Sequence, residues 1–176
     1  MSIKLIAVDM DGTFLSDQKT YNRERFMAQY QQMKAQGIRF VVASGNQYYQ
    51  LISFFPEIAN EIAFVAENGG WVVSEGKDVF NGELSKDAFT TVVEHLLTRP
   101  EVEIIACGKN SAYTLKKYGD GGNDIEMLRQ AGFSFAMENA GNAVVAAAKY
   151  RAGSNNREGV LDVIDKVLKH EAPFDQ

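Results

Sequence analysis

The stretch LIAVDMDGT, residues 5–13, decides the predicted fold of this chain. Its first four residues form a short apolar run, which is typical of a buried strand. Two aspartates, a glycine and a threonine follow at the point where that strand ends. Because ligands of open α/β sheets bind at the carboxyl ends of the strands, this end is a candidate site.

Outward from this stretch, short apolar runs alternate with segments of helical periodicity. We expect strands over 5–8, 38–43, 62–66, 103–107 and 133–136, helices over 22–36, 49–55, 85–98, 123–131, 142–148 and 156–170, and a hairpin over 69–77. Strand, helix and strand in repeated succession predict βαβ units and therefore an α/β fold with a parallel sheet and right-handed crossovers.

Composition excludes several classes of protein. The 176 residues carry a net charge of −5 without a basic cluster, which argues against nucleic-acid or membrane partners. No stretch approaches the roughly 18 apolar residues of a membrane-spanning helix. We expect a cytoplasmic protein whose one cysteine, Cys107, is a buried thiol.

Asp9 and Asp11 are the first candidate catalytic pair. A strand that runs into a loop can turn both carboxylates toward one point, where two such charges about 4 Å apart repel by roughly 4 kcal/mol. They then separate, share a proton or bind a cation. Gly12 permits a close backbone approach, and Thr13 offers a hydroxyl and an amide to an anion. The alternative interpretation is an ordinary turn, in which aspartate and glycine are common.

Ser44 and Gly45 follow the second predicted strand, at the same edge of the sheet. The serine hydroxyl and the glycine amide can hold a phosphate oxygen there. The alternative role for Ser44 is a cap at the end of the strand.

A third element is the glycine-rich loop Gly119-Asp-Gly-Gly-Asn-Asp124. Asn123 is a good helix N-cap, and Asp124 falls in the first turn, where the helix dipole favours an anion. Asp120 has no such structural duty, and its carboxylate is a hard oxygen ligand suited to Mg²⁺.

Together these pieces resemble the haloacid dehalogenase superfamily of aspartate-based phosphatases. The resemblance covers residues 3–84 and 119–172, and it rests on Asp9–Thr13, Ser44 and Gly119–Asp124 as three of the family's motifs. Glu67-Asn-Gly69 and Ala152-Gly-Ser-Asn-Asn-Arg-Glu-Gly159 resemble the Cof-type sugar-phosphatase branch. The resemblance implies a Rossmann-like core of residues 1–84 and 119–176, with helices on both faces of its sheet, and an α+β cap remnant at 85–118.

The resemblance also implies a reaction. Asp9 would attack phosphorus to form an aspartyl-phosphate, and Asp11 would protonate the leaving oxygen and then activate water. The implied substrate is a small phosphorylated metabolite, above all a sugar phosphate. Mg²⁺ would be held by Asp9, Asp120 and the backbone carbonyl of Asp11, with support from Asp124, while Ser44 and Asn123 would contact the phosphoryl group.

Two parts of the family pattern are missing. Residues 85–118 are too few for a complete cap, which normally excludes water and selects the substrate. The third-motif lysine and the apolar strand before the acidic loop are also absent; Lys116 and Lys117 are the nearest cations. An internal deletion, or two segments joined across an omitted one between Tyr118 and Gly119, would produce this juxtaposition. We favour the omitted segment.

Two other functions stay open. A phospho-acceptor module similar to receiver domains also combines strand-end aspartates with a hydroxyl and a lysine, although receivers place the phosphorylated aspartate on a later strand. A truncated, inactive remnant that still binds Mg²⁺ is the other.

Overall fold

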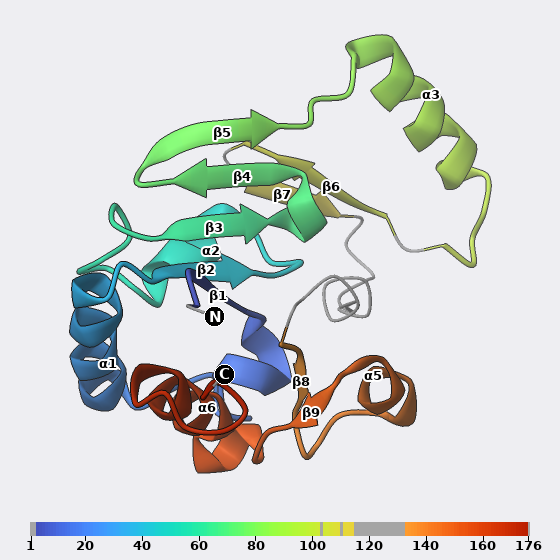
Figure 1. The fold of residues 1–176 in the computed structure, drawn as a ribbon. Coiled ribbons are helices and arrows are strands. Elements are labelled where there is room, and N and C mark those ends of the chain that lie inside the picture. Colours follow the sequence, from blue (N-terminus) through green and yellow to red (C-terminus); the bar gives the residue numbers. More distant parts are fainter. Residues whose placement is uncertain (1–2, 103, 110, 115–132, 176) are drawn as a thin grey trace. The chain divides into compact units, whose positions relative to one another are not determined.

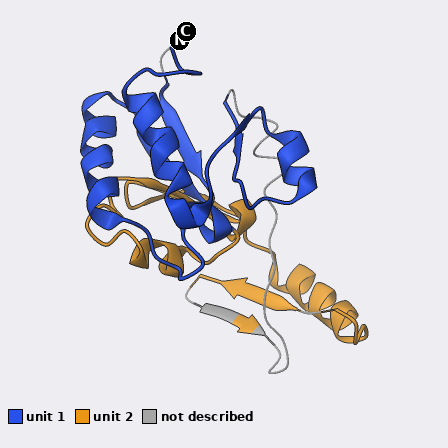
Figure 2. Cartoon of the chain, turned by 90° about the horizontal axis from the view of Figure 1, so that it is seen from below, with its two compact units in different colours: residues 1–44, 124–176 blue, residues 45–123 orange. Residues whose placement is uncertain are grey.

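The computed structural model describes residues 3–102, 104–109, 111–114 and 133–175 (Figure 1). The chain divides into two compact units, residues 1–44 with 124–176 and residues 45–123 (Figure 2).

Unit 1 begins with the βαβ arrangement that the sequence predicts. β1 (Leu5–Val8) and β2 (Arg39–Ala43) pair in parallel, and α1 (Arg23–Ala35) connects them. The Asn22 side chain caps α1 by accepting a hydrogen bond from the Arg25 amide at 3.1 Å. Gly37, with φ 66°, follows the last turn of α1 in the left-handed conformation common after helices.

The C-terminal segment completes unit 1. β8 (Phe135–Ala136) pairs in parallel with β9 (Tyr150–Arg151), and α5 (Asn142–Ala147) lies between them in the chain. After a short 3-10 turn at Asn155–Arg157, α6 (Gly159–Leu168) packs against α1. The fully buried core side chains of this unit include Met10, Leu15, Phe26, Met33, Val42 and Ile164. The sequence pattern did not predict β9, because a two-residue strand shows no periodicity.

A charged cluster joins α1 to α6. The Arg25 guanidinium donates to Glu158 at 2.6 Å, to Asp162 at 2.8 Å and to Asp165 at 2.6 Å, and Gln29 donates to Asp165 at 2.7 Å. Hydrogen bonds from Arg25 and Asn22 lower the pKa of Glu158. Burial alone would raise the pKa of Asp165. The hydrogen bonds from Arg25 and Gln29 outweigh burial, so the pKa of that carboxyl is lowered.

We expect Arg25→Ala to lower the free energy of unfolding at pH 7 by about 2 kcal/mol, because hydrogen bonds to charged groups contribute about 1.5–3 kcal/mol. Urea unfolding measures the change. The matched control is Arg157→Ala, which breaks an exposed ion pair with Glu138 and should cost about 0.5 kcal/mol or less. Equal losses in the two variants would contradict the role of Arg25.

The same cluster has a defined pH dependence. Glu158 and Asp165 have pKa values in the folded protein below their ordinary values of 4.5 and 3.8. Their contribution to the stability of the folded protein is therefore fully present above the ordinary values, and it is lost as the pH falls through the lower pKa values of the folded protein. The difference between the parent and the Arg25→Ala variant should therefore shrink in acid, below about pH 4.

Unit 2 contains α2 (Tyr48–Ser53), the antiparallel strands β3 (Ala63–Ala66), β4 (Trp71–Ser74) and β5 (Lys77–Asn81), and α3 (Lys86–Leu97). Ser85 caps α3 by accepting from the Ala88 amide at 3.2 Å. A second antiparallel pair joins β6 (Ile105–Gly108) to β7 (Ser111–Thr114). β7 falls in the stretch whose polar residues gave no strand pattern.

Two expectations about burial are wrong. Leu5 of β1 is 53% exposed, and among the described strands only β2 pairs with β1, so its other side lacks the cover of a central strand. Cys107 is exposed rather than buried.

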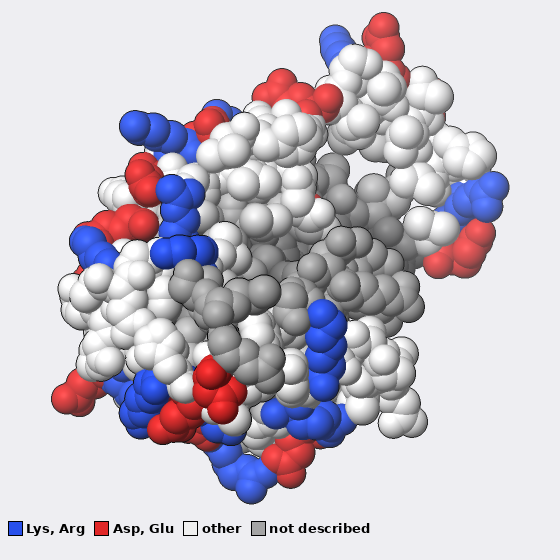
Figure 3. Space-filling view, in the orientation of Figure 1, with Lys and Arg blue, Asp and Glu red and all other residues white. Residues whose placement is uncertain are grey.

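The α3 helix has no buried residue, and its Phe89, Val92 and Leu97 are exposed. In Figure 3 most of the surface of α3 is white, that is, without acidic or basic side chains. The assignment of residues 85–118 as the remnant of a cap domain stays a prediction. Among the described residues no helix has both the length and the hydropathy of a membrane span.

Candidate active site

The residues after β1 form a tight turn that separates the two aspartates. Asp9 is 9% exposed, and its carbonyl accepts a hydrogen bond from the Phe14 amide at 3.2 Å. The Leu15 amide bonds the Met10 carbonyl at 2.9 Å, which closes the next turn. Gly12 has φ +69°. A residue with a side chain adopts this conformation only at a cost in free energy, so the turn depends on glycine.

The parallel pairing of β1 with β2 brings Asp9 and Ser44 to one edge. Val8 lies opposite Val42 in the register. Asp9 therefore follows β1 directly, and Ser44 follows β2, two residues beyond Val42. Ser44 is 9% exposed, as Asp9 is, so both side chains are largely withdrawn from solvent.

Asp11 lies in an ion pair that the sequence did not predict. Lys19 Nζ is 2.6 Å from Asp11 Oδ1, and the two side chains are 62% and 41% exposed. A turn between Ser16 and Thr20 places this lysine, because the Lys19 amide bonds the Ser16 carbonyl and the Ser16 amide bonds the Thr20 carbonyl, each at 2.9 Å. The nearest cations to the acidic loop in the sequence, Lys116 and Lys117, lie outside the described residues.

Gly45 belongs to unit 2, where it lies beside the Glu67–Gly69 stretch. A Cβ at residue 45 would be 3.2 Å from the Asn68 side-chain amide, so a larger residue here would require that amide to shift by a few tenths of an ångström. The Glu67 amide donates to the Asn46 carbonyl at 3.1 Å. Burial raises the pKa of Glu67, which favours its neutral form more than in water.

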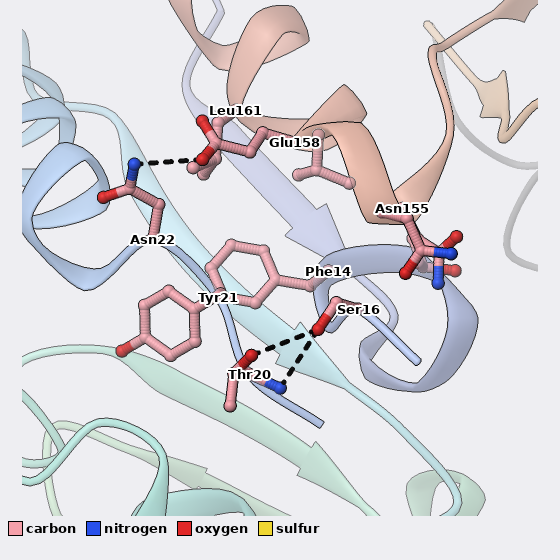
Figure 4. Close-up of a pocket in the computed structure, with 11 residues that line it drawn as sticks. Phe14, Ser16, Thr20, Tyr21, Asn22, Asn155, Glu158 and Leu161 are labelled. Carbon is pink, nitrogen blue, oxygen red and sulfur yellow. Dashed lines mark hydrogen bonds between the residues drawn. The ribbon is translucent and has the colours of Figure 1, made fainter. Parts of the chain in front are cut away.

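Thr13 lines a cavity of about 150 Å³ in unit 1 (Figure 4). Phe14, Tyr21 and Leu161 supply apolar walls, and the hydroxyls of Ser16 and Thr20 bond each other at 3.1 Å. A bond of 3.0 Å from Asn22 to Glu158 crosses another side of the cavity. Since neither Asp9 nor Asp11 lines it, this cavity is distinct from the carboxylate edge.

Three asparagines of the C-terminal segment bind the turn after β1. Asn139 Nδ2 donates to the Gly12 carbonyl at 2.9 Å, and Asn155 Nδ2 donates to the Leu15 carbonyl at 3.2 Å. Asn155 and Asn156 both donate to the Asp17 carboxylate, at 3.0 and 2.8 Å, and the bonds from Asn156 and Asn155 lower the pKa of Asp17.

Ala152–Gly159 resembles a stretch of the Cof-type branch, but its sequence pattern predicts no role for Asn155 or Asn156. The stretch Met137-Glu-Asn-Ala-Gly-Asn142 could have indicated a role for Asn139, because this asparagine belongs to no predicted helix or strand.

The donor chemistry at the edge fits Mg²⁺. Carboxylate and carbonyl oxygens are the ligands this cation prefers, and Asp9, Asp11 and the Asp11 carbonyl supply them. The described residues contain no group of three acidic, histidine or cysteine side chains that could hold a metal. The other predicted site residues of the acidic loop, Asp120, Asn123 and Asp124, lie outside the described residues.

Comparison with known proteins gives a family match over most of the chain. The model of a haloacid dehalogenase-like hydrolase family matches residues 6–118 and 117–164. The two matched parts meet at residues 117–118, beside the Tyr118–Gly119 junction. The peptide link at that junction lies outside the described residues, so an omitted segment there stays a prediction.

Three individual proteins illustrate the similarity. The 5-amino-6-(5-phospho-D-ribitylamino)uracil phosphatase YbjI of Escherichia coli (strain K12) is 64% identical over 271 aligned positions, which cover 100% of both chains. That span exceeds the 176 residues here by 95 positions. YcsE of Bacillus subtilis (strain 168), a phosphatase named for the same compound, is 23% identical with 93% and 95% coverage. The crystal structure of SMU.1108c from Streptococcus mutans UA159 has a TM-score of 0.88 and 27% identity, and covers 96% of this chain and 100% of that one.

Proposed function

Because this chain belongs to the haloacid dehalogenase-like hydrolases, we propose that it hydrolyses small phosphate esters with Mg²⁺ through an aspartyl-phosphate intermediate. The family, the phosphatase class and the α/β fold predicted from the sequence are confirmed. The proposed aspartyl-phosphate reaction with Mg²⁺ rests on one observation. Asp9 and Ser44 are both buried and follow two paired strands at the same edge of the sheet.

The proposed reaction has two steps, both at the end of β1. In the first, an Asp9 carboxylate oxygen attacks phosphorus, the bond to the ester oxygen breaks, and Asp11 donates a proton to the departing alcohol. In the second, Asp11 takes a proton from water, which attacks the aspartyl-phosphate and releases inorganic phosphate and the Asp9 carboxylate. A carboxylate nucleophile thereby divides one difficult displacement into two easier ones.

The remaining groups would bind the phosphoryl oxygens. The Ser44 hydroxyl, the amides of Thr13 and Gly45, and the Asn123 side chain are the proposed donors. Mg²⁺, held by Asp9, Asp120 and the Asp11 carbonyl with Asp124 in support, would neutralise charge on the phosphoryl group. In the structure Lys19 Nζ lies 2.6 Å from Asp11 Oδ1, and this ion pair would open when substrate binds, so that Asp11 can carry the proton that it donates in the first step.

Similarity to the two relatives named for 5-amino-6-(5-phospho-D-ribitylamino)uracil favours a phosphorylated sugar or sugar alcohol as the substrate. We propose residues 1–84 and 119–176 as the catalytic core and 85–118 as a cap remnant. Because a complete cap excludes water and selects the substrate, a remnant should leave turnover weak and poorly selective.

Turnover of p-nitrophenyl phosphate tests the function and separates it from the two alternatives. We expect slow, continuous release of p-nitrophenol with Mg²⁺ and little without it. A receiver-like acceptor would instead become phosphorylated once and stop. A remnant that only binds Mg²⁺ would show no release under either condition, and that result would contradict the proposed function.

A further inference from the structure

Asn139 makes a hydrogen bond that bears on the Thr13 amide. Its Nδ2 donates to the Gly12 carbonyl at 2.9 Å, across 127 positions of sequence. In a planar trans peptide the carbonyl and the following amide point in opposite directions. Holding the Gly12 carbonyl therefore also fixes the direction of the Thr13 N–H, which points away from Asn139.

Gly12 needs such a partner more than other residues do. Its φ of +69° is available to glycine at little cost, but glycine also has access to many other conformations. The turn keeps its shape only while other contacts select one of them. The Phe14 and Leu15 amides make the bonds inside the turn, and Asn139 supplies an anchor from outside it.

Asn155 fixes which end of the Asn139 amide faces the turn. The Asn155 backbone N–H can only donate, and it bonds Asn139 Oδ1 at 3.3 Å. The other end, Nδ2, is thereby directed at the Gly12 carbonyl. Asn155 is itself 5% exposed and donates to the Leu15 carbonyl at 3.2 Å, so it is tied to the far end of the same turn.

We propose that Asn139, oriented by Asn155, is a positioning residue that sets the Gly12–Thr13 peptide plane and so aims the Thr13 amide at the phosphoryl group. This inference rests on the proposed function, in which Thr13 N–H binds a phosphoryl oxygen. We call the two asparagines the Asn139–Asn155 brace. Donors that must be preoriented toward developing charge act mainly on the chemical step, so the brace should affect kcat more than KM.

The decisive variant is Asn139→Asp. Its carboxylate still accepts from the Asn155 amide, but it cannot donate to Gly12 and instead places negative charge against that carbonyl. We expect kcat for p-nitrophenyl phosphate to fall by about 10- to 100-fold, the range seen when groups that orient a site's direct ligands are removed. KM should change by less than about threefold, since a uniform loss of binding would raise KM instead. Asn139→Ala, at an exposed position, is the second variant if the aspartate disturbs folding.

Amide hydrogen exchange measured by NMR gives a readout that does not depend on activity. The Phe14 and Leu15 amides should exchange at least about tenfold faster in both Asn139 variants, because their bonds belong to the braced turn. The matched control is Asn156→Ala, which removes two bonds to Asp17 but none to Gly12 or Leu15. It should leave kcat and both exchange rates within about twofold of the parent.

Faster exchange together with a lower kcat in the Asn139 variants would support the brace. Unchanged exchange, with or without a lower kcat, would overturn it, and so would faster exchange at an unchanged kcat. If the parent itself shows no turnover, the proposed function fails, and the exchange rates then decide whether the brace orders the turn.

Discussion

Asp9→Asn is expected to abolish turnover of p-nitrophenyl phosphate while the fold survives. An amide cannot attack phosphorus as a carboxylate does, and no aspartyl-phosphate can then form at this position. The substitution is nearly isosteric at a side chain that is 9% exposed, so the packing around it is preserved. Far-UV circular dichroism and thermal melting verify the fold, and initial rates measure the loss. Phosphatase activity equal to that of the parent would refute Asp9 as the nucleophile.

Asp11→Asn is the natural contrast, because it removes proton transfer and keeps the nucleophile. It should slow turnover by about 10²- to 10⁴-fold, the usual contribution of a general acid or base. The loss should be smaller for p-nitrophenyl phosphate than for an alkyl phosphate, since p-nitrophenolate leaves without a proton. Equal losses for the two substrates would argue against a proton donated by Asp11.

The second large effect concerns Mg²⁺ and Asp120. The proposed site brings the carboxylates of Asp9 and Asp120 together, which is unfavourable without a cation. A ligand that binds only the folded state raises its stability, so millimolar Mg²⁺ should raise the Tm of the parent. Asp120→Ala should remove both this shift and Mg²⁺-dependent turnover.

The matched control for the metal experiment is Asp17→Ala. Asp17 is an acidic residue of the loop after β1, but its carboxylate bonds Asn155 and Asn156 and is not a proposed ligand. This variant should keep the Mg²⁺-dependent shift. A parent whose Tm does not respond to Mg²⁺, or an Asp120→Ala variant whose Tm still rises, would contradict the proposed site.

The sequence by itself determined the local elements and the family. Helical spacing and the glycine at residue 37 predicted the helix that became α1, and apolar runs predicted β1, β2 and β3, because periodicity and capping are properties of neighbouring residues. The Asp9–Thr13 stretch and the second-strand serine likewise carried the family resemblance, which the family match confirms.

Tertiary structure alone decided the rest. The burial of β1 depends on whether a neighbouring strand covers its side chains. Leu5 is 53% exposed, although the apolar sequence of β1 is typical of a buried strand. Lys19 reaches Asp11 only because a turn reverses the chain, and Asn139 meets Gly12 across 127 residues. Such contacts depend on the path of the chain through space, and no local pattern encodes them, so the side chains that orient this site became visible only in the fold.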